Sequence, residues 1–155
     1  MSDAPQGLVR YPDGWRSKAI LLAWHERQVS AHLEQLAAIG KRPGRAADRL
    51  QSVLDAFALI MHERDRSDLA ALLHRNEHVA HAEHRLHGFV RDLVTEGVEA
   101  GNLRTDVSPD ELATYCVHAL GAARVLPSRA AIQRLVGVTL AGLRQAAVAK
   151  GRAGR

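Results

Sequence analysis

The residues of this chain with the clearest potential for chemistry are five histidines at steps of four, three, three and three residues. Two imidazoles one helical turn apart can bind the same metal ion, and the first two members of this row have that spacing. Glu77 or Glu83 could add a carboxylate ligand. The full row is His74, His78, His81, His84 and His87. Its first three members, His74, His78 and His81, are weak candidates for metal ligands.

The same histidines have a simpler interpretation. Asn76 can end one helix or cap the next, which would break the row, and the later members drift around the helix axis. A solvated polar face opposite Leu86 and Phe89 explains the cluster without a metal, and we favour it. A pH-responsive patch is a further interpretation, because histidine titrates near neutral pH. No cofactor is predicted.

The sequence contains no recognisable catalytic motif. His25-Glu26 and His62-Glu63 begin like the helical zinc-protease motif, but neither is followed by its second histidine. The Glu-x-x-His pair of helical di-iron sites is missing, as is a glycine-rich phosphate loop. The single cysteine, Cys116, lies on an apolar helix face, where inert burial is commoner than catalysis. We therefore do not expect an enzyme.

Helices must position these residues, because the apolar pattern is helical almost throughout. Apolar residues at three- and four-residue steps predict six helices and no sheet. Gly101 is typical of a helix end, and 108–111 (Ser-Pro-Asp-Glu) is typical of a helix start with a capping box and proline at the first position. The predicted fold class is all-α, with helices over about 20–36, 50–61, 69–73, 86–97, 112–123 and 129–148.

The composition is that of a soluble globular domain. Of the 155 residues, 46% are hydrophobic and 25% are charged, and the net charge is +4. The apolar stretches are too short to span a membrane, and the first residues lack the apolar core of a secretory signal. One cysteine cannot form an internal disulfide, so we expect a cytoplasmic location. The basic balance permits contact with nucleic acid but does not indicate it.

One segment resembles a known family. Residues 93–113 contain Gly101, the sequence Leu-Arg-Thr-Asp at 103–106 and a capped helix beginning Pro-Asp-Glu-Leu. This order is similar to the junction between the seventh and eighth helices of tetracycline-repressor-type (TetR) transcriptional regulators. Residues 134–144 are similar to the ninth helix of that family, and 15–21 to the joint before its fourth helix.

The resemblance implies a domain organisation as well as a fold. Residues 17–148 would form a TetR C-terminal-like helical bundle that binds a ligand and dimerises. Residues 1–16 would be a flexible segment or a remnant of the joint to a DNA-binding domain, and 149–155 a basic disordered tail.

A ligand cavity is the first functional feature that the resemblance implies. In TetR-type regulators the fourth to eighth helices enclose a small molecule, which we expect here to be largely apolar. Tyr115 and His118 are three residues apart on one helix face and could anchor such a ligand by hydrogen bonds. Alternatively, both are partly buried and satisfied locally. The residues that the resemblance places in the cavity are Trp24, Phe57, Met61, Phe89, Tyr115 and His118.

A dimer interface is the second implied feature, because the eighth and ninth helices of two TetR subunits form a four-helix bundle. The small residues of the last helix would let a partner helix approach closely, although they also suit packing within one subunit. Since both final helices carry broad apolar faces, we favour a symmetric homodimer. The implied interface residues are Leu112, Ala119, Leu135, Gly137, Val138, Ala141 and Gly142.

The chain departs from the family at its beginning. TetR-type regulators start with a three-helix DNA-binding domain that holds a helix-turn-helix, and of this only the joint at 15–21 is recognisable. Truncation, a late start site and natural loss are equally compatible with the sequence. Direct DNA binding by this chain alone is not expected.

The predicted function is therefore that of a small-molecule-sensing and dimerisation domain of a TetR-type regulator, without its own DNA-reading helices. One alternative is a stand-alone ligand binder or a heterodimerising modulator of a full-length regulator. A histidine-based metal or pH sensor is the alternative from another class. Neither the ligand nor the operator and regulated genes follow from the sequence.

Overall fold

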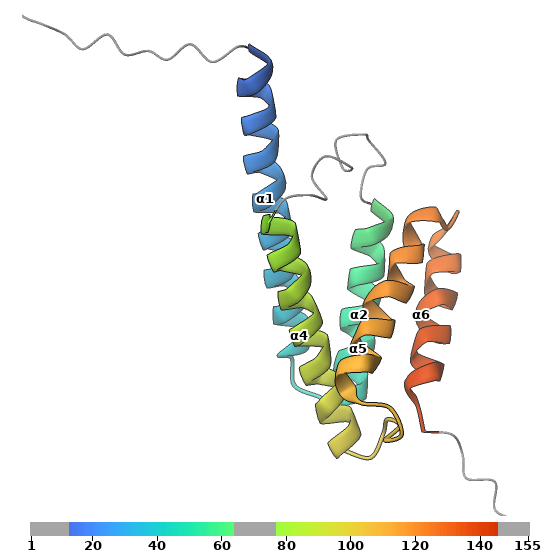
Figure 1. Ribbon diagram of the computed structural model, residues 1–155. Coiled ribbons are helices and arrows are strands. Elements are labelled where there is room, and N and C mark those ends of the chain that lie inside the picture. Colours follow the sequence, from blue (N-terminus) through green and yellow to red (C-terminus); the bar gives the residue numbers. More distant parts are fainter. Residues whose placement is uncertain (1–12, 64–76, 146–155) are drawn as a thin grey trace, which may run out of the picture.

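The computed structural model describes residues 13–63 and 77–145, and within these ranges the chain is helical with no β-sheet (Figure 1). The all-α prediction is confirmed. The predicted short helix at 69–73 lies outside the described residues. The elements are α1 (Asp13–Gly40), α2 (Ala46–Glu63), α4 (Glu77–Glu99), α5 (Pro109–Leu120), the 3-10 helix η1 (Gly121–Val125) and α6 (Arg129–Leu143).

Helix α5 starts where the sequence predicts. The Ser108 hydroxyl accepts a hydrogen bond from the backbone N–H of Glu111 at 3.2 Å, and Pro109 occupies the first helical turn. The predicted helix over 112–123 is divided, however. The backbone N–H of Gly121 donates to the carbonyl of His118, three residues earlier, which is the 3-10 pattern. The chain then continues as η1.

The last helix is shorter than predicted. We expect it to reach 148 from the sequence, but α6 ends at Leu143, and Arg144 has extended dihedral angles. The carbonyl of Leu143 accepts a hydrogen bond from the backbone N–H of Arg104 at 2.9 Å, and Arg144 forms a β-bridge with Leu103. The end of α6 therefore pairs with the loop after α4 instead of continuing as a helix.

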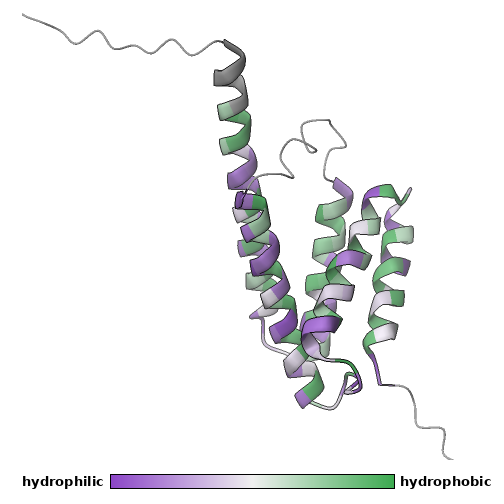
Figure 2. Ribbon diagram, in the orientation of Figure 1, coloured by the Kyte–Doolittle hydropathy of each residue, from purple (hydrophilic) through white to green (hydrophobic). Residues whose placement is uncertain are grey.

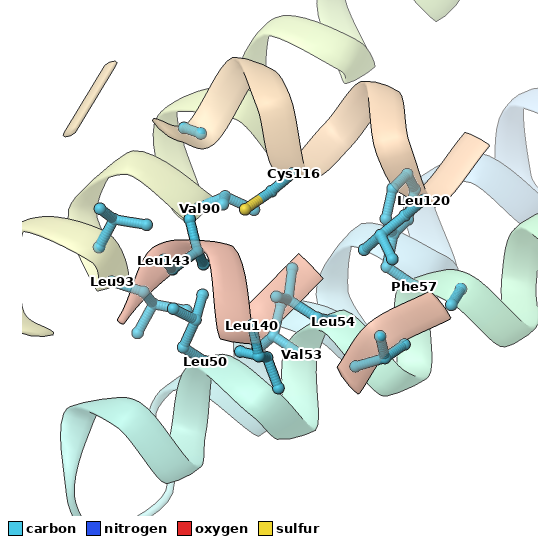
Figure 3. Packing of buried hydrophobic residues seen from close by; sticks show 14 of the residues in the cluster. Leu50, Val53, Leu54, Phe57, Val90, Leu93, Cys116, Leu120, Leu140 and Leu143 are labelled. Carbon is cyan, nitrogen blue, oxygen red and sulfur yellow. The ribbon is translucent and has the colours of Figure 1, made fainter. Parts of the chain in front are cut away.

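Helix α2 is the centre of the hydrophobic core. It packs against α1, α4, α5, η1 and α6, and hydrophobic residues occur along its whole length (Figure 2). Its apolar side chains recur every three or four residues, so they form one continuous buried stripe. Figure 3 shows them meeting residues of α4, α5 and α6, among them Val90, Cys116 and Leu140. The buried residues of α2 are Ala46, Leu50, Val53, Leu54, Phe57, Ala58 and Met61.

The Leu-Arg-Thr-Asp sequence at 103–106 fastens the α4–α5 loop to the end of α6. Leu103 is buried and lies against Gly97, where a Cβ atom would come within 2.6 Å of the leucine side chain. The Arg104 guanidinium donates to both carboxylate oxygens of Asp106, at 2.7 and 2.6 Å, and to the carbonyl of Gly142 at 3.2 Å. This hydrogen-bonded guanidinium lowers the pKa of Asp106. The segment that carries the family resemblance thus has a structural role.

The end of α1 is fastened in a comparable way. The Phe89 ring of α4 occupies the space beside Gly40, where a Cβ atom would lie 2.3 Å from the ring. Arg49 of α2 donates to the carbonyl of Gly40 at 3.0 Å and pairs with Glu96 of α4. These contacts tie α1, α2 and α4 together at one end of the bundle. At the other end α1 extends past its neighbours (Figure 1). None of the described helices combines the length and the apolarity needed to cross a membrane.

Substitution of Leu54 by alanine tests the role of α2. Leu54 has an exposed fraction of 0% and lies in the centre of the core, so Leu54→Ala is expected to lower the free energy of unfolding by about 2–5 kcal/mol. The measurement is denaturant unfolding followed by circular dichroism. The matched control is Ile20→Ala on the exposed part of α1, with an expected change within about 0.5 kcal/mol. Equal effects of the two variants would contradict the assignment of the core.

Candidate ligand-binding cavity

A cavity of about 460 Å³ lies between α1, α2, α4 and the junction of α5 with η1. Most of its wall is apolar. One stripe of each surrounding helix contributes, because residues three or four positions apart share a helix face. The apolar lining residues are Val29, Leu33, Leu36, Phe57, Ile60, Met61, Val79, Ala82, Leu86 and Val117, together with Gly121.

Small residues leave room for the cavity. Ala82 is the buried residue of α4 between Val79 and Leu86, and Gly121 stands where α5 becomes η1. A leucine at either position would project into the space that the neighbouring helices surround. Small side chains at these two positions, among larger apolar residues, therefore leave part of the space between the helices unfilled.

Polar side chains also reach the wall of the cavity. His118 is exposed, and its Nδ1 lies 2.9 Å from the carbonyl of Thr114. Because a carbonyl only accepts, Nδ1 carries the proton and Nε2 is left for other partners. His87 of α4 has Nε2 at 3.0 Å from the hydroxyl of Thr114, which links α4 to α5. The polar lining residues are His32, Glu83, His87, His118 and Arg124.

Arg124 brings a permanent positive charge to this wall. It lies on η1, is half-buried, and has Nη2 at 3.6 Å from the Sδ atom of Met61 on α2. The backbone beside it is held in place, since His62 Nδ1 lies 3.0 Å from the carbonyl of Ala123. These two contacts join η1 to the end of α2.

Comparison with known proteins identifies the family. The sequence model for the C-terminal domain of SbtR-like transcriptional regulators, a TetR-type domain, matches residues 57–145. The chain belongs to the TetR family. No individually curated protein matches it.

Solved structures agree on the fold of this TetR-family chain. A transcriptional regulator of the TetR/AcrR family from Thermobifida fusca YX-ER1 is similar with a TM-score of 0.67 at 19% identity, over 83% of this chain and 75% of the other. The ketosteroid transcriptional regulator KstR2 of Mycobacterium tuberculosis is similar with a TM-score of 0.58 at 17% identity, over 78% of this chain and 71% of that one. At these identities the likeness concerns the fold.

The six residues that the family resemblance places in the cavity separate into two groups. Phe57, Met61 and His118 line it. Trp24 does not and is 55% exposed, and Phe89 packs beside the end of α1. Tyr115 is 54% exposed and donates a hydrogen bond to the Glu111 carboxylate, which raises the pKa of the tyrosine. Tyr115 and His118 therefore do not face one cavity.

Several lining residues were not predicted as cavity residues. The missed apolar ones lie on the predicted helix stripes, but a stripe does not show which of its members border a hollow. Arg124 had no sequence signal of its own, because its role depends on η1. The missed residues are Val29, His32, Leu33, Leu36, Ile60, Val79, Ala82, Glu83, Leu86, His87, Val117, Gly121 and Arg124.

The residues expected at a TetR dimer interface differ in exposure. Leu112 is buried in the core of its own subunit, and Ala119 and Leu135 are half-buried. The other four expected interface residues belong to α6 and are exposed, and Val138 has an exposed fraction of 72%. These exposed residues of α6 are Gly137, Val138, Ala141 and Gly142.

The histidine row is only partly described. His74 lies outside the described residues, whereas His78 is half-buried and His81 is exposed on α4. Among residues 13–63 and 77–145, no group of three or more His, Cys, Asp or Glu side chains is arranged to hold a metal ion. His87 of the same row faces α5 and the cavity.

The environment of Cys116 predicts a thiol that reacts slowly with alkylating reagents. Cys116 is fully buried, and burial raises its pKa to about 11. The thiol is therefore protonated at about pH 8, and the reactive thiolate is scarce. We expect no modification of the native chain by iodoacetamide in mass spectrometry, and complete modification after unfolding in guanidinium chloride. Rapid modification of the native chain would contradict this burial.

Proposed function

We propose that this chain is the small-molecule-sensing and dimerisation domain of a TetR-type transcriptional regulator, acting in the cytoplasm. The single observation that carries the sensing role is the largely apolar cavity between α1, α2, α4 and α5. Its volume of about 460 Å³ lies within the range of about 300–1,000 Å³ that is usual for small-molecule sites. The apolar wall favours a ligand with a predominantly apolar body.

Helix α1 is the part of the cavity wall through which the ligand would act. It contributes Val29, Leu33 and Leu36 to the wall and then extends past the bundle toward the N-terminus (Figure 1). In TetR-type regulators the corresponding helix joins the DNA-binding domain. Ligand occupancy influences that domain if the ligand binds one placement of α1 more tightly than another.

Filling the cavity tests the sensing role. Ala82 is buried on the cavity wall, so Ala82→Phe should place a ring in the space that a ligand would use. We expect the affinity for the neutral fluorescent probe N-phenylnaphthylamine to fall at least about tenfold, which corresponds to about 1.4 kcal/mol of binding free energy. The measurement is a fluorescence titration of the full chain.

The matched control is Ala80→Phe, two positions away on the exposed side of the same helix. This variant should bind the probe like the unmodified chain. Denaturant unfolding of both variants shows whether they are folded. Unchanged probe binding by a folded Ala82→Phe variant would overturn the cavity as the binding site.

The dimerisation role is supported by exposed apolar side chains of α5, η1 and α6. Tyr115 and Ala122 are exposed on α5 and η1, and Val125 and Val138 are 71% and 72% exposed. A lone subunit would leave these apolar side chains in water, whereas a symmetric partner would cover them. Small residues of α6, Gly137 and its neighbours, allow close approach of a second helix pair.

A charge among these side chains is expected to separate the subunits. In a two-fold symmetric interface, Val138→Glu introduces two carboxylates at once, and their burial without partners is unfavourable. We expect sedimentation velocity to show a dimer for the unmodified chain and a monomer for this variant. Ile20→Glu, at an exposed apolar position on α1, serves as the control and should remain dimeric. A dimer that tolerates Val138→Glu would place the interface elsewhere.

A further inference from the structure

Arg124 lies at one end of the cavity. Helices α1 and α4 run in the direction opposite to α2 and α5 (Figure 1). Met61 near the end of α2, Val79 near the start of α4 and Arg124 just after α5 therefore lie at the same end of the cavity. Toward the opposite end the wall is formed by buried Leu36 and Phe57.

Arg124 is the lining group best able to select a ligand by charge. Its planar guanidinium combines a positive charge with a fork of N–H donors, a combination that no other lining side chain offers. Glu83 is the opposing charge among the lining residues, but it is exposed while Arg124 is half-buried. Water screens an exposed charge more strongly than a half-buried one, so of these two charges Arg124 is the better placed to act on a ligand in the cavity.

The shape of the guanidinium favours a carboxylate as the anionic group of the ligand. Its fork of N–H donors matches the two oxygens of a planar carboxylate. The contact of Nη2 with the Met61 sulfur places the guanidinium beside the apolar wall formed by α2. A ligand that satisfies both features has a carboxylate at one end and an apolar body that extends toward Leu36 and Phe57.

From this arrangement we infer that the cavity binds an amphipathic carboxylic acid, with its carboxylate on Arg124 and its apolar body between α1, α2 and α4. This inference rests on the proposed sensing role and adds the chemical class of the ligand. It assigns to Arg124 a role in specificity: the apolar wall supplies binding to any apolar body, and the guanidinium favours the anion.

The test uses three probes that share one alkyl chain: octanoate, octan-1-ol and octylamine. Their affinities for the full chain and for Arg124→Met are measured by isothermal titration calorimetry. Methionine replaces the aliphatic stem of arginine with an unbranched apolar side chain but removes the charge and the donors. We expect Arg124→Met to weaken octanoate binding about tenfold or more, as for the loss of a charge-assisted hydrogen bond, and to leave octanol binding within about twofold. Octylamine should bind most weakly to the unmodified chain.

Two further variants make the result specific. Arg124→Lys keeps the charge but not the fork, so its octanoate affinity should lie between those of the unmodified chain and Arg124→Met. Arg91→Met removes an exposed arginine of α4 that does not line the cavity, and it should bind all three probes unchanged. Octanol binding shows that each variant retains an intact cavity.

Three other outcomes would contradict the carboxylate assignment, and one of them would also contradict the sensing role. Octanoate affinity that is unchanged in Arg124→Met, with octanol still bound, overturns the carboxylate assignment and leaves the sensing role in place. Tighter binding of octylamine than of octanoate also overturns it and points to Glu83. If none of the three probes binds and N-phenylnaphthylamine does not bind either, the sensing role and this inference both fail.

Discussion

The structure depends on the burial of helix α2. This helix contacts every other described helix, and its apolar stripe from Leu50 to Met61 is almost completely removed from water. Burial of several large side chains at about 1.5–3 kcal/mol each is the main favourable contribution to such a core. The surrounding helices are placed by their contacts with α2, and the cavity forms where those contacts stop.

The cavity follows from the same packing. Phe57 and Met61 belong to the core and to the cavity wall at once. On the side facing α4, Ala82 does not fill the space in front of them. A closely packed interior normally leaves few voids larger than a water molecule. The cavity opens to solvent beside the exposed side chains of Glu83 and His118, and the small residues Ala82 and Gly121 leave space on its wall.

Much of the fold could be predicted from the sequence, because helix periodicity and capping are local properties. The cap at Ser108 and the left-handed residue Gly101, with φ of +77°, are both found as predicted. The predicted end of α6 was wrong because the actual end depends on hydrogen bonds from Arg104, which is distant in sequence. The division of α5 from η1 likewise gave no clear signal, since Gly121 is tolerated in either kind of helix.

The site was harder to predict than the fold. Periodicity assigns a residue to a helix face, but a face about 100° wide borders more than one neighbour. Tyr115 and His118 are three positions apart, and this rotation is enough to place His118 beside the cavity and Tyr115 beside Glu111 in solvent. Phe89 is half-buried against the core, and the residue beside its ring is Gly40 of α1, so it does not line the cavity. Only the packed structure shows which members of a stripe surround a hollow.

The fastening of α1 at Gly40 has a mechanical consequence. With 28 residues at about 1.5 Å each, α1 is roughly 40 Å long, and it is clamped by Phe89 and Arg49 close to one tip. The side chains of α1 that touch the cavity lie between that clamp and the middle of the rod. When a helix tilts about one fixed end, its displacement is largest at the other end. A small tilt of α1 beside the cavity therefore becomes a larger displacement near Asp13.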